Sequence, residues 1–498
     1  MNLKGVSTLK NIGFDNDKYL KTQSEHIKER IEQFGDKLYL EFGGKLFDDY
    51  HASRVLPGFL PDSKMKMLLQ LKDQAEIVIA ISAGAIASNK IRGDLGITYD
   101  QDVLRLMDIF HNLGLYVGSV AITQYTGEEA ADRFREKLSN LGVKSYLLRR
   151  IEDYPGNVEH IVSDDGFGKN DYIETSRPLV VITAPGPGSG KMATCLSQLY
   201  HENKRGVRAG YAKFETFPIW NLPLKHPVNV AYEAATADLN DVNMIDPFHL
   251  EAYGVTTVNY NRDIEIFPVL KAMFEQIYGE CPYQSPTDMG VNMAGNCICN
   301  DDACQYAAKQ EIIRRYYTEA CNIKKGTGTK EAFYKLELLM KQVKVEPSDR
   351  DVVRYALIKE GTTNGPAAAI ELGDDHVATG KTTDLLSAPA AVLLNALKEL
   401  AGIDHEIHLI SPEALAPITQ LRNVNLGISD SRLHCNEVLI ALSISSATDA
   451  NAKKALEQLP NLTGLEMHST VMLTASDEDI LRRLHLNITC EPRTEYRP

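Results

Sequence analysis

The N-terminal half of the sequence alternates short apolar runs with amphipathic helical patterns, and this alternation constrains the fold more than any other feature. The helical patterns include residues 100–114 and 127–142, where apolar residues recur every three or four positions. Strands that alternate with helices form right-handed crossovers and a parallel sheet covered on both faces. We therefore expect a doubly wound, mainly parallel α/β layer sandwich. The apolar runs predicted to be its strands span residues 38–43, 76–84, 116–123, 144–149 and 178–185.

The pattern changes near residue 264. From there to about residue 345 it is mainly helical, and after residue 351 strand and helix patterns alternate again. A chain of 498 residues is also long enough for two or three hydrophobic cores. The sequence therefore predicts an α/β domain over residues 1–265, a helical region over 266–350, and a second, smaller α/β domain over 351–498.

Charge and composition exclude several classes of protein. The formal net charge is −14, whereas proteins that bind duplex nucleic acid need a basic face to neutralise phosphates. The first 20 residues lack the apolar core of a secretory signal, and no run of about 18 apolar residues occurs anywhere. Eight cysteines in so long a chain do not indicate a disulfide scaffold. We expect a cytoplasmic protein without a nucleic-acid or membrane partner.

Residues 180–200, VVITAPGPGSGKMATCLSQLY, contain a candidate phosphate-binding loop. Such a loop needs a buried strand, a glycine-rich turn with inward-pointing amides, a lysine, and the positive N-terminal end of a helix. The strand predicted over 179–183 and the helical pattern after the loop supply this setting. The residues expected to hold a phosphate are Gly186, Gly188, Ser189, Gly190 and Lys191.

This loop departs from the G-x-x-x-x-G-K-[ST] pattern in two places. Pro185 stands at the first glycine, and Met192 stands where a hydroxyl would bind magnesium. Thr194, three residues after the lysine, is also expected to bind the phosphate, although on a helix its hydroxyl faces the site only after some rotation. The missing hydroxyl weighs more against magnesium-dependent hydrolysis than against anion binding. The alternative is a tight strand-to-helix turn that needs glycine and proline and leaves its lysine in solvent.

The segment after this helix, residues 213–254, contains several polar side chains that are candidate ligand contacts. Connections that leave the carboxyl ends of strands build the ligand crevice of an open α/β sheet, and long irregular connections are often functional. A predicted strand that begins at residue 256 leads to one more carboxylate, in the position of a weak Walker-B-like acid. Taken singly, each of these residues is more often a turn cap or a solvated group. The candidates for catalysis or substrate binding are Lys213, Glu215, His226, Asp238, Asp246, His249 and Asp263.

The C-terminal region contains secondary candidates. Lys381 and Thr382 precede a predicted helix, whose positive end could meet an anion, although a capped helix with a solvated lysine fits equally well. His434, Glu437 and His468 are expected on strands or at their edges, where only the fold decides whether they meet. Three cysteines within residues 297–304 have poor spacing for zinc and no nearby histidine. No metal site is predicted.

Long phrases of the sequence resemble an uncharacterised bacterial family, domain-of-unknown-function family eighteen-forty-six. They include TAPGPGSGKMATCLSQLYHE, KFETFPIWNLPLKHPVNVAYEAATADL and SPTDMGVNMAG, with EMHSTVML near the end. The resemblance covers nearly the whole chain and implies an N-terminal and a C-terminal family domain, but no reaction. Some relatives carry the label ATP-dependent zinc protease. This sequence has no H-E-x-x-H motif, since HEIH at 405–408 has the wrong spacing.

These observations favour an enzyme that depends on a nucleotide or a phosphorylated metabolite, because phosphoryl transfer requires mainly positioning and charge neutralisation. The expected partner is a small phosphorylated ligand, and a nucleotide with magnesium is the candidate cofactor. One alternative is a non-catalytic ligand-binding or scaffolding protein, and another is a hydrolase that uses His434, Glu437 and His468. The large apolar helical region and the frequency of symmetric assemblies also favour a homo-oligomer.

Overall fold

The computed structural model describes residues 12–35, 37–43, 46–47, 49–92, 95–373, 376–428 and 432–495. The chain forms two compact units. The N-terminal unit consists of Ile12–Glu233 and Asp241–Gln305, and the C-terminal unit includes Ala234–Asn240 and the chain from Tyr306 onward. The described residues include no helix that is both long enough and apolar enough to cross a membrane.

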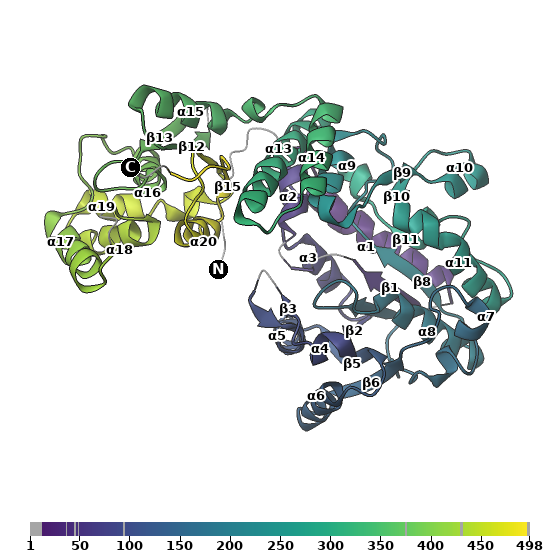
Figure 1. Ribbon diagram of the computed structural model, residues 1–498. Helices are drawn as coiled ribbons and strands as arrows, with labels where there is room; N and C mark the ends of the chain where they lie inside the picture. The colour runs from purple at the N-terminus through teal and green to yellow at the C-terminus, as the bar shows by residue number, and fades with distance from the viewer. Residues whose placement is uncertain are drawn as a thin grey trace. The chain divides into compact units, whose positions relative to one another are not determined.

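A seven-stranded parallel sheet forms the centre of the N-terminal unit (Figure 1). Its strand order is β11-β8-β1-β7-β2-β5-β6, and every neighbouring pair runs parallel. The three central strands are buried along their whole length, as continuous apolar runs predict. The strands are β1 (Leu38–Phe42), β2 (Ala75–Ser82), β5 (Tyr116–Tyr125), β6 (Lys144–Arg149), β7 (Leu179–Thr183), β8 (Gly210–Phe214) and β11 (Gly290–Val291). The predicted parallel α/β sandwich is confirmed.

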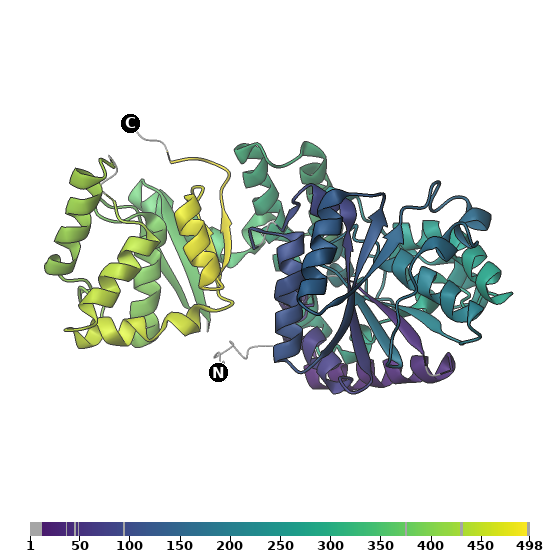
Figure 2. The ribbon, with the colours of Figure 1, turned by 90° about the horizontal axis from the view of Figure 1, so that it is seen from below.

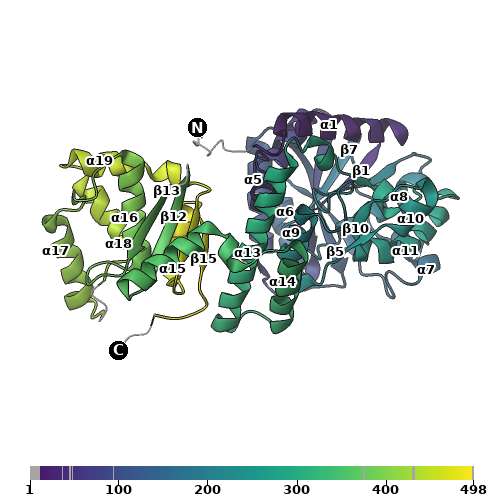
Figure 3. The same ribbon diagram turned by 90° about the horizontal axis from the view of Figure 1, so that it is seen from above.

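Helices cover both faces of this sheet (Figures 2 and 3). On β8, the ring of Tyr211 contacts Phe274 of α11, whereas Phe214 faces Lys64 of α3 on the opposite side. The helices of this unit are α1 (Asn16–Gln33), α2 (Tyr50–Val55), α3 (Ser63–Gln70), α4 (Ala83–Ala87), α5 (Tyr99–Asn112), α6 (Glu129–Asn140), α7 (Val158–Ile161), α8 (Lys191–Lys204), α10 (Pro247–Tyr253), α11 (Asn261–Tyr278) and α12 (Pro286–Met289).

Two small antiparallel pairs accompany the large sheet, β3 (Ile91–Arg92) with β4 (Ile97–Thr98) and β9 (Asn243–Ile245) with β10 (Val258–Tyr260). Helices α9 (Pro227–Ala235) and α13 (Asp301–Lys325) each continue from one unit into the other.

The C-terminal unit contains a four-stranded mixed sheet in the order β13-β12-β14-β15. Strand β12 pairs antiparallel with β13 and β14, and β14 pairs parallel with β15. Its strands are β12 (Ala367–Gly373), β13 (His376–Lys381), β14 (Glu466–Ser469) and β15 (Asn487–Cys490). Its helices are α14 (Lys330–Val343), α15 (Asp351–Thr363), α16 (Ala388–Ala401), α17 (Pro412–Gln420), α18 (Cys435–Ser445), α19 (Ala450–Leu456) and α20 (Ala475–Arg483). Helix α16 supplies much of the apolar core against this sheet.

Candidate functional site

The N-terminal unit contains a pocket of about 1040 Å³ at the carboxyl ends of its strands. Strands β1, β5 and β6 contribute residues near their carboxyl ends, and the β7–α8 loop completes the wall. This is the edge at which open parallel sheets bind ligands. The lining residues are Glu41, Thr123, Gln124, Thr126, Leu148, Arg149, Arg150, Ile151, Glu152, Asp153, Tyr154, Phe167, Asn170, Gly188, Ser189, Gly190, Lys191, Met192 and Ala193.

The loop between β7 and α8 is built around glycine. Gly188 and Gly190 have φ angles of 75° and 77°, in the left-handed region that glycine enters without strain. A Cβ atom at Gly186 would collide with the ring of Tyr99, so packing alone requires glycine there. Helix α8 begins at Lys191, directly after Gly190.

Side chains of the neighbouring strand β5 hold two carbonyl groups of this loop. The Thr123 hydroxyl donates a hydrogen bond to the carbonyl oxygen of Ser189 at 2.8 Å. The Gln124 side-chain amide donates to the carbonyl oxygen of Gly188 at 3.3 Å. Both bonds turn carbonyl groups toward β5.

The loop's own hydroxyls hold two further carbonyl groups. Ser189 donates to the carbonyl oxygen of Gly186 at 2.9 Å, and Thr194 donates to that of Gly190 at 2.9 Å. Both residues are almost completely buried. Their hydroxyl protons therefore shape the loop, and Thr194 is not oriented as the magnesium ligand of a P-loop would be.

The backbone amides of residues 188–193 remain free. In the described part of the chain, no carbonyl or side chain accepts a hydrogen bond from them, and α8 has no side-chain N-cap. A helix N-terminus carries a partial positive charge on such amides. The arrangement is therefore chemically suited to an anion.

Three cationic side chains line the same pocket. Lys191 begins α8, while Arg149 ends β6 and Arg150 follows it. None of the three forms a salt bridge with any residue that the structure describes. Neither arginine was predicted as a site residue. Their place at the carboxyl end of the strand predicted over 144–149 could have indicated that they lie near a ligand.

Glu41 is the buried carboxylate of the pocket. It is 8% exposed, and the Tyr211 hydroxyl donates to its Oε2 atom at 2.8 Å. Glu41 was not predicted as a site residue either, because a single acidic residue in an apolar strand does not indicate which side chains lie beside it in the fold.

A half-buried charge cluster lies beside Glu41. Lys213 of β8 occupies the position paired with Glu41 of β1. Its ammonium contacts Asp263 at 2.7 Å and Glu215 at 2.9 Å. Three of the predicted site residues are thus brought together.

The pKa values of this cluster reflect burial and crowded charge. Burial alone would lower the pKa of Lys213, but Asp263 and Glu215 hold it above its usual range. Burial raises the pKa of Glu215 to about 7, with Asp263 adding to the effect and Lys213 opposing it. Glu215 therefore exchanges its proton near neutral pH.

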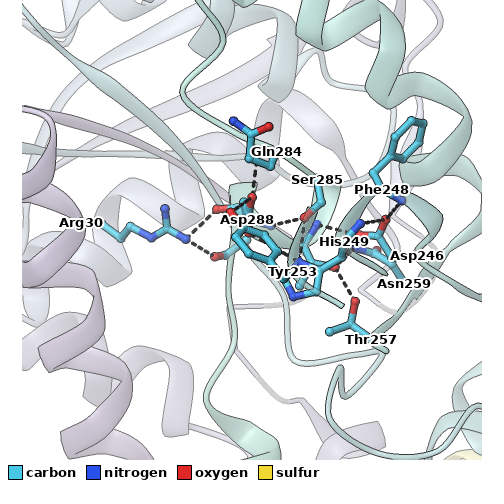
Figure 4. A network of polar contacts seen from close by, with 12 residues as sticks. Arg30, Asp246, Phe248, His249, Tyr253, Thr257, Asn259, Gln284, Ser285 and Asp288 are labelled. Atoms are coloured by element: carbon cyan, nitrogen blue, oxygen red, sulfur yellow. Dashed lines mark hydrogen bonds and ion pairs between the residues drawn. The ribbon is translucent and has the colours of Figure 1, made fainter. Parts of the chain in front are cut away.

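Asp246 and His249 belong to a separate polar network (Figure 4). Asp246 caps α10 by accepting from the backbone amides of Phe248 and His249 at 3.0 and 3.1 Å. The Nδ1 atom of His249 lies 2.9 Å from the Ser285 hydroxyl.

This network does not form a catalytic triad. The carboxylate of Asp288 approaches the same Nδ1 atom of His249 at 3.6 Å, whereas a triad uses both ring nitrogens. Ser285 is fully buried and caps α12 by accepting from the amide of Asp288 at 3.1 Å. The network thus orders two short helices.

His226 and Asp238 lie apart from the pocket lining. His226 is buried, and its Nε2 atom contacts Asp301 at 3.0 Å. Burial lowers the pKa of His226, which Asp301 opposes. Asp238 is exposed and belongs to the C-terminal unit.

The predicted helix start beside Lys381 is wrong. Lys381 ends strand β13, and α16 begins only at Ala388, where the hydroxyl of Ser387 caps it. The amide of Thr382 donates to the carbonyl oxygen of Pro366 at 2.8 Å. Neither Lys381 nor Thr382 therefore lies at a helix N-terminus.

The three C-terminal hydrolase candidates occupy different settings. His434 and Glu437 were expected on a strand but form the capped start of helix α18, and His434 contacts Asp477 at 2.7 Å. This hydrogen bond raises the pKa of His434. His468 lies on β14, fully buried, with Nδ1 2.9 Å from the Thr489 hydroxyl. Among the described residues, no contact joins His468 to His434 or Glu437.

Metal ligands do not gather at any place in the described chain. No three His, Cys, Asp or Glu residues within it are placed to hold one ion. Cys297 contacts the Thr22 hydroxyl, and the thiol of Cys304 faces the carbonyl oxygen of Gly13 at 3.4 Å.

Comparison with protein families decides the classification. The domain of unknown function DUF1846 matches residues 12–344 with its N-terminal part and residues 348–497 with its C-terminal part. The chain belongs to this family. It is similar to the UPF0371 protein stu1377 of Streptococcus thermophilus, with 57% identity over 488 residues, which cover 98% of this chain and 99% of that protein.

Two further relatives show the same extent of similarity. A UPF0371 protein of Streptococcus pneumoniae strain JJA is 56% identical over 488 residues, covering 98% of this chain and 99% of its own. The UPF0371 protein M28_Spy1076 of Streptococcus pyogenes is 57% identical over 484 residues, covering 97% and 98%. Every residue that lines the pocket lies within the N-terminal DUF1846 domain.

Proposed function

We propose that this protein binds a nucleotide or another phosphorylated metabolite in the pocket at the carboxyl ends of β1, β5, β6 and β7. Its phosphate group contacts the amides of residues 188–193. The observation that supports the proposal most is that the loop's carbonyl groups are hydrogen-bonded whereas its amides are not. The carbonyls are hydrogen-bonded to protein side chains, and the amides have no acceptor in the described chain.

Charge supports the same assignment. Lys191, Arg149 and Arg150 line the pocket without carboxylate partners among the described residues. Guanidinium groups bind phosphate through paired hydrogen bonds, and a lysine adds a point charge. In this proposal the three cations neutralise the phosphate while the amides fix its position.

The position of the uncapped amides separates α8 from the other helices. The helices α1, α10 and α16 have side-chain N-caps that satisfy their first amides. Helices α6, α8, α11 and α15 have none, but of these four only the start of α8 lines the pocket. Unsatisfied amides at the wall of a pocket favour a ligand site over a turn that only reverses the chain.

The half-buried charge cluster of Lys213, Glu215 and Asp263 favours an enzyme over a non-catalytic binding protein. A general acid or base works best when its pKa lies near the operating pH, and burial brings the pKa of Glu215 to about 7. Charged clusters with pKa values shifted in this way concentrate at functional sites. Glu215 is not among the residues that line the pocket, so we assign it no direct contact with the ligand. We assign no magnesium ligand either, since Met192 and the hydrogen-bonded Thr194 do not provide one.

The proposal is tested by thermal shift and calorimetric titration with inorganic phosphate, AMP, ATP and sugar phosphates. A ligand that binds only the folded protein raises its melting temperature. Lys191→Ala should weaken binding by about 1.5–3 kcal/mol, or roughly ten- to hundred-fold, because a charge-assisted hydrogen bond is lost.

Lys381→Ala is the matched control, since it removes the lysine that follows Gly380, in a segment that resembles the β7–α8 loop in sequence. It should leave every affinity within about two-fold, and both variants should fold normally. Failure of all phosphorylated ligands to stabilise the wild-type protein would exclude the proposed site, as would equal binding by wild type and Lys191→Ala.

A further inference from the structure

Glu41 indicates that the ligand has a hydrogen-bond donor in addition to its phosphate group. It lines the pocket and is nine-tenths buried on strand β1. Tyr211 donates to Oε2, whereas Oε1 accepts no hydrogen bond from any residue the structure describes. This oxygen is therefore available to accept a hydrogen bond from a ligand in the pocket.

The pocket is much larger than a phosphate ion. Its volume of about 1040 Å³ is at the upper end of the range for small-molecule sites. The free amides lie at one part of the lining, on the β7–α8 loop, and Glu41 lies on another strand. One ligand can therefore use both groups only if a hydrogen-bond donor accompanies its phosphate.

The surroundings of Glu41 favour a neutral donor. Lys213 occupies the paired position on the adjacent strand, and Lys191 lines the same pocket. Lys213 is already paired with Asp263 and Glu215, but Lys191 has no carboxylate partner among the described residues. A hydroxyl can donate to Oε1 without a charge of its own to desolvate, whereas an ammonium would lose hydration and meet the charge of Lys191. Glu152 and Asp153 also line the pocket but are exposed, so water already satisfies their oxygens.

We propose that the pocket takes a polyhydroxylated phosphate ester, a sugar phosphate or nucleotide, and that Oε1 of Glu41 accepts a hydrogen bond from one of its hydroxyls. This inference rests on the proposed function, since it assumes the phosphate at the loop amides. It assigns Glu41 as the residue that selects a hydroxylated ester over a simple one.

The test compares dissociation constants of the wild-type protein for inorganic phosphate, ethyl phosphate, glycerol 3-phosphate, ribose 5-phosphate, AMP and phosphoethanolamine. At least one hydroxylated ester should bind about ten-fold or more tightly than ethyl phosphate, as expected for a hydrogen bond to a charged group. The ribose 5-phosphate and AMP arms distinguish a sugar phosphate from a nucleotide. Tightest binding by phosphoethanolamine would overturn the choice of a hydroxyl.

Glu41→Gln tests the residue itself. The amide oxygen can keep the Tyr211 hydrogen bond, which leaves an amide donor in place of the Oε1 acceptor. Binding of the preferred ester should weaken about ten- to hundred-fold, while inorganic phosphate and ethyl phosphate change less than about two-fold. Glu457→Gln, at an exposed site of the C-terminal unit, is the control for the same chemical change.

The outcomes separate the two proposals. No binding of any phosphate compound to wild type would remove the proposed function itself. Binding of inorganic phosphate without any preference for hydroxylated esters would overturn only this inference, as would equal weakening of all ligands by Glu41→Gln. The wild-type ligand series decides the point even if Glu41→Gln fails to fold.

Discussion

The glycine-lysine segments at Lys191 and Lys381, the two predicted as anion sites, look alike in sequence but differ in structure. At Lys191, a strand leads through a glycine loop directly into α8, and six successive amides have no acceptor among the described residues. At Lys381, the lysine ends a strand, and the following backbone is already hydrogen-bonded. Composition does not distinguish the two, whereas the pairing of their backbone groups does.

In the segment after Lys381, the groups of the turn form hydrogen bonds with one another. The Thr383 hydroxyl accepts from the amide of Leu386 at 2.9 Å, and the amide of Thr383 donates to the carbonyl oxygen of Leu386 at 2.9 Å. Ser387 then caps α16. The amides of Thr382, Thr383, Leu385, Leu386 and Ser387 thus all have acceptors within the described chain, which favours a structural turn.

Gly190→Ala should have the largest effect on stability and phosphate binding, because it changes the loop that precedes Lys191. The substitution places a side chain at a φ of 77° and brings its Cβ within 3.0 Å of the Thr123 Cβ atom. Strain and crowding together should lower the free energy of unfolding by about 2–4 kcal/mol and abolish phosphate binding. Urea denaturation and calorimetric titration measure both.

Gly84→Ala, in a helix with open space around the position, is the matched control for Gly190→Ala. It should be neutral or slightly stabilising, because alanine favours a helix. Unchanged stability and binding in Gly190→Ala would show that the left-handed loop is unimportant.

A pH-dependent effect of intermediate size is expected from the charge cluster beside the pocket. Burial raises the pKa of Glu215 from 4.5 to about 7, so the folded state binds more protons than the unfolded chain between these values. The free energy of unfolding should therefore fall as the pH rises from 4.5 to about 7, by at most about 1.4 kcal/mol per pH unit. Lys213 remains protonated throughout and adds no slope.

Glu215→Gln should remove this part of the pH dependence. Urea denaturation of both proteins at pH 5, 6, 7 and 8 isolates it, because all other titrating groups are shared. Parallel stability curves for the two proteins would mean that Glu215 titrates at the same pH in the folded and unfolded states.

The smallest effect is expected from Ser387→Ala in the second segment. Loss of the α16 cap should lower the free energy of unfolding by about 1 kcal/mol. Phosphate affinity should stay within about two-fold, because no ligand is assigned to that helix end. A marked loss of phosphate binding in this variant would contradict the distinction between the two segments.

The sequence predicted the sheet well where strands are buried and apolar. The runs at 76–84 and 178–185 correspond closely to β2 and β7, because β-branched residues in short apolar runs favour buried strands. Strand β8 was not predicted, since GYAKF combines glycine, alanine and lysine. His434 and Glu437, expected on strands or at their edges, lie instead at the capped start of α18, because that cap stabilises a helix.

The site was predicted only in part. Local spacing marked Lys191 and its loop, because loop and helix are adjacent in the chain. Glu41 and Arg149 could not be joined to it, since their proximity depends on strand order, which places β7 beside β1 and sets β6 two strands beyond β2. Periodicity predicts strands but does not specify their order.

The hydrogen bonds that hold the loop's carbonyl groups also have a kinetic consequence. Ordering a flexible backbone costs about 1–2 kcal/mol per residue, but hydrogen bonds from Thr123, Gln124, Ser189 and Thr194 fix this loop within the protein itself. A ligand that meets a prearranged set of amides needs no slow loop closure. Association should therefore follow a single exponential whose rate rises linearly with ligand concentration, without the plateau that a conformational step imposes.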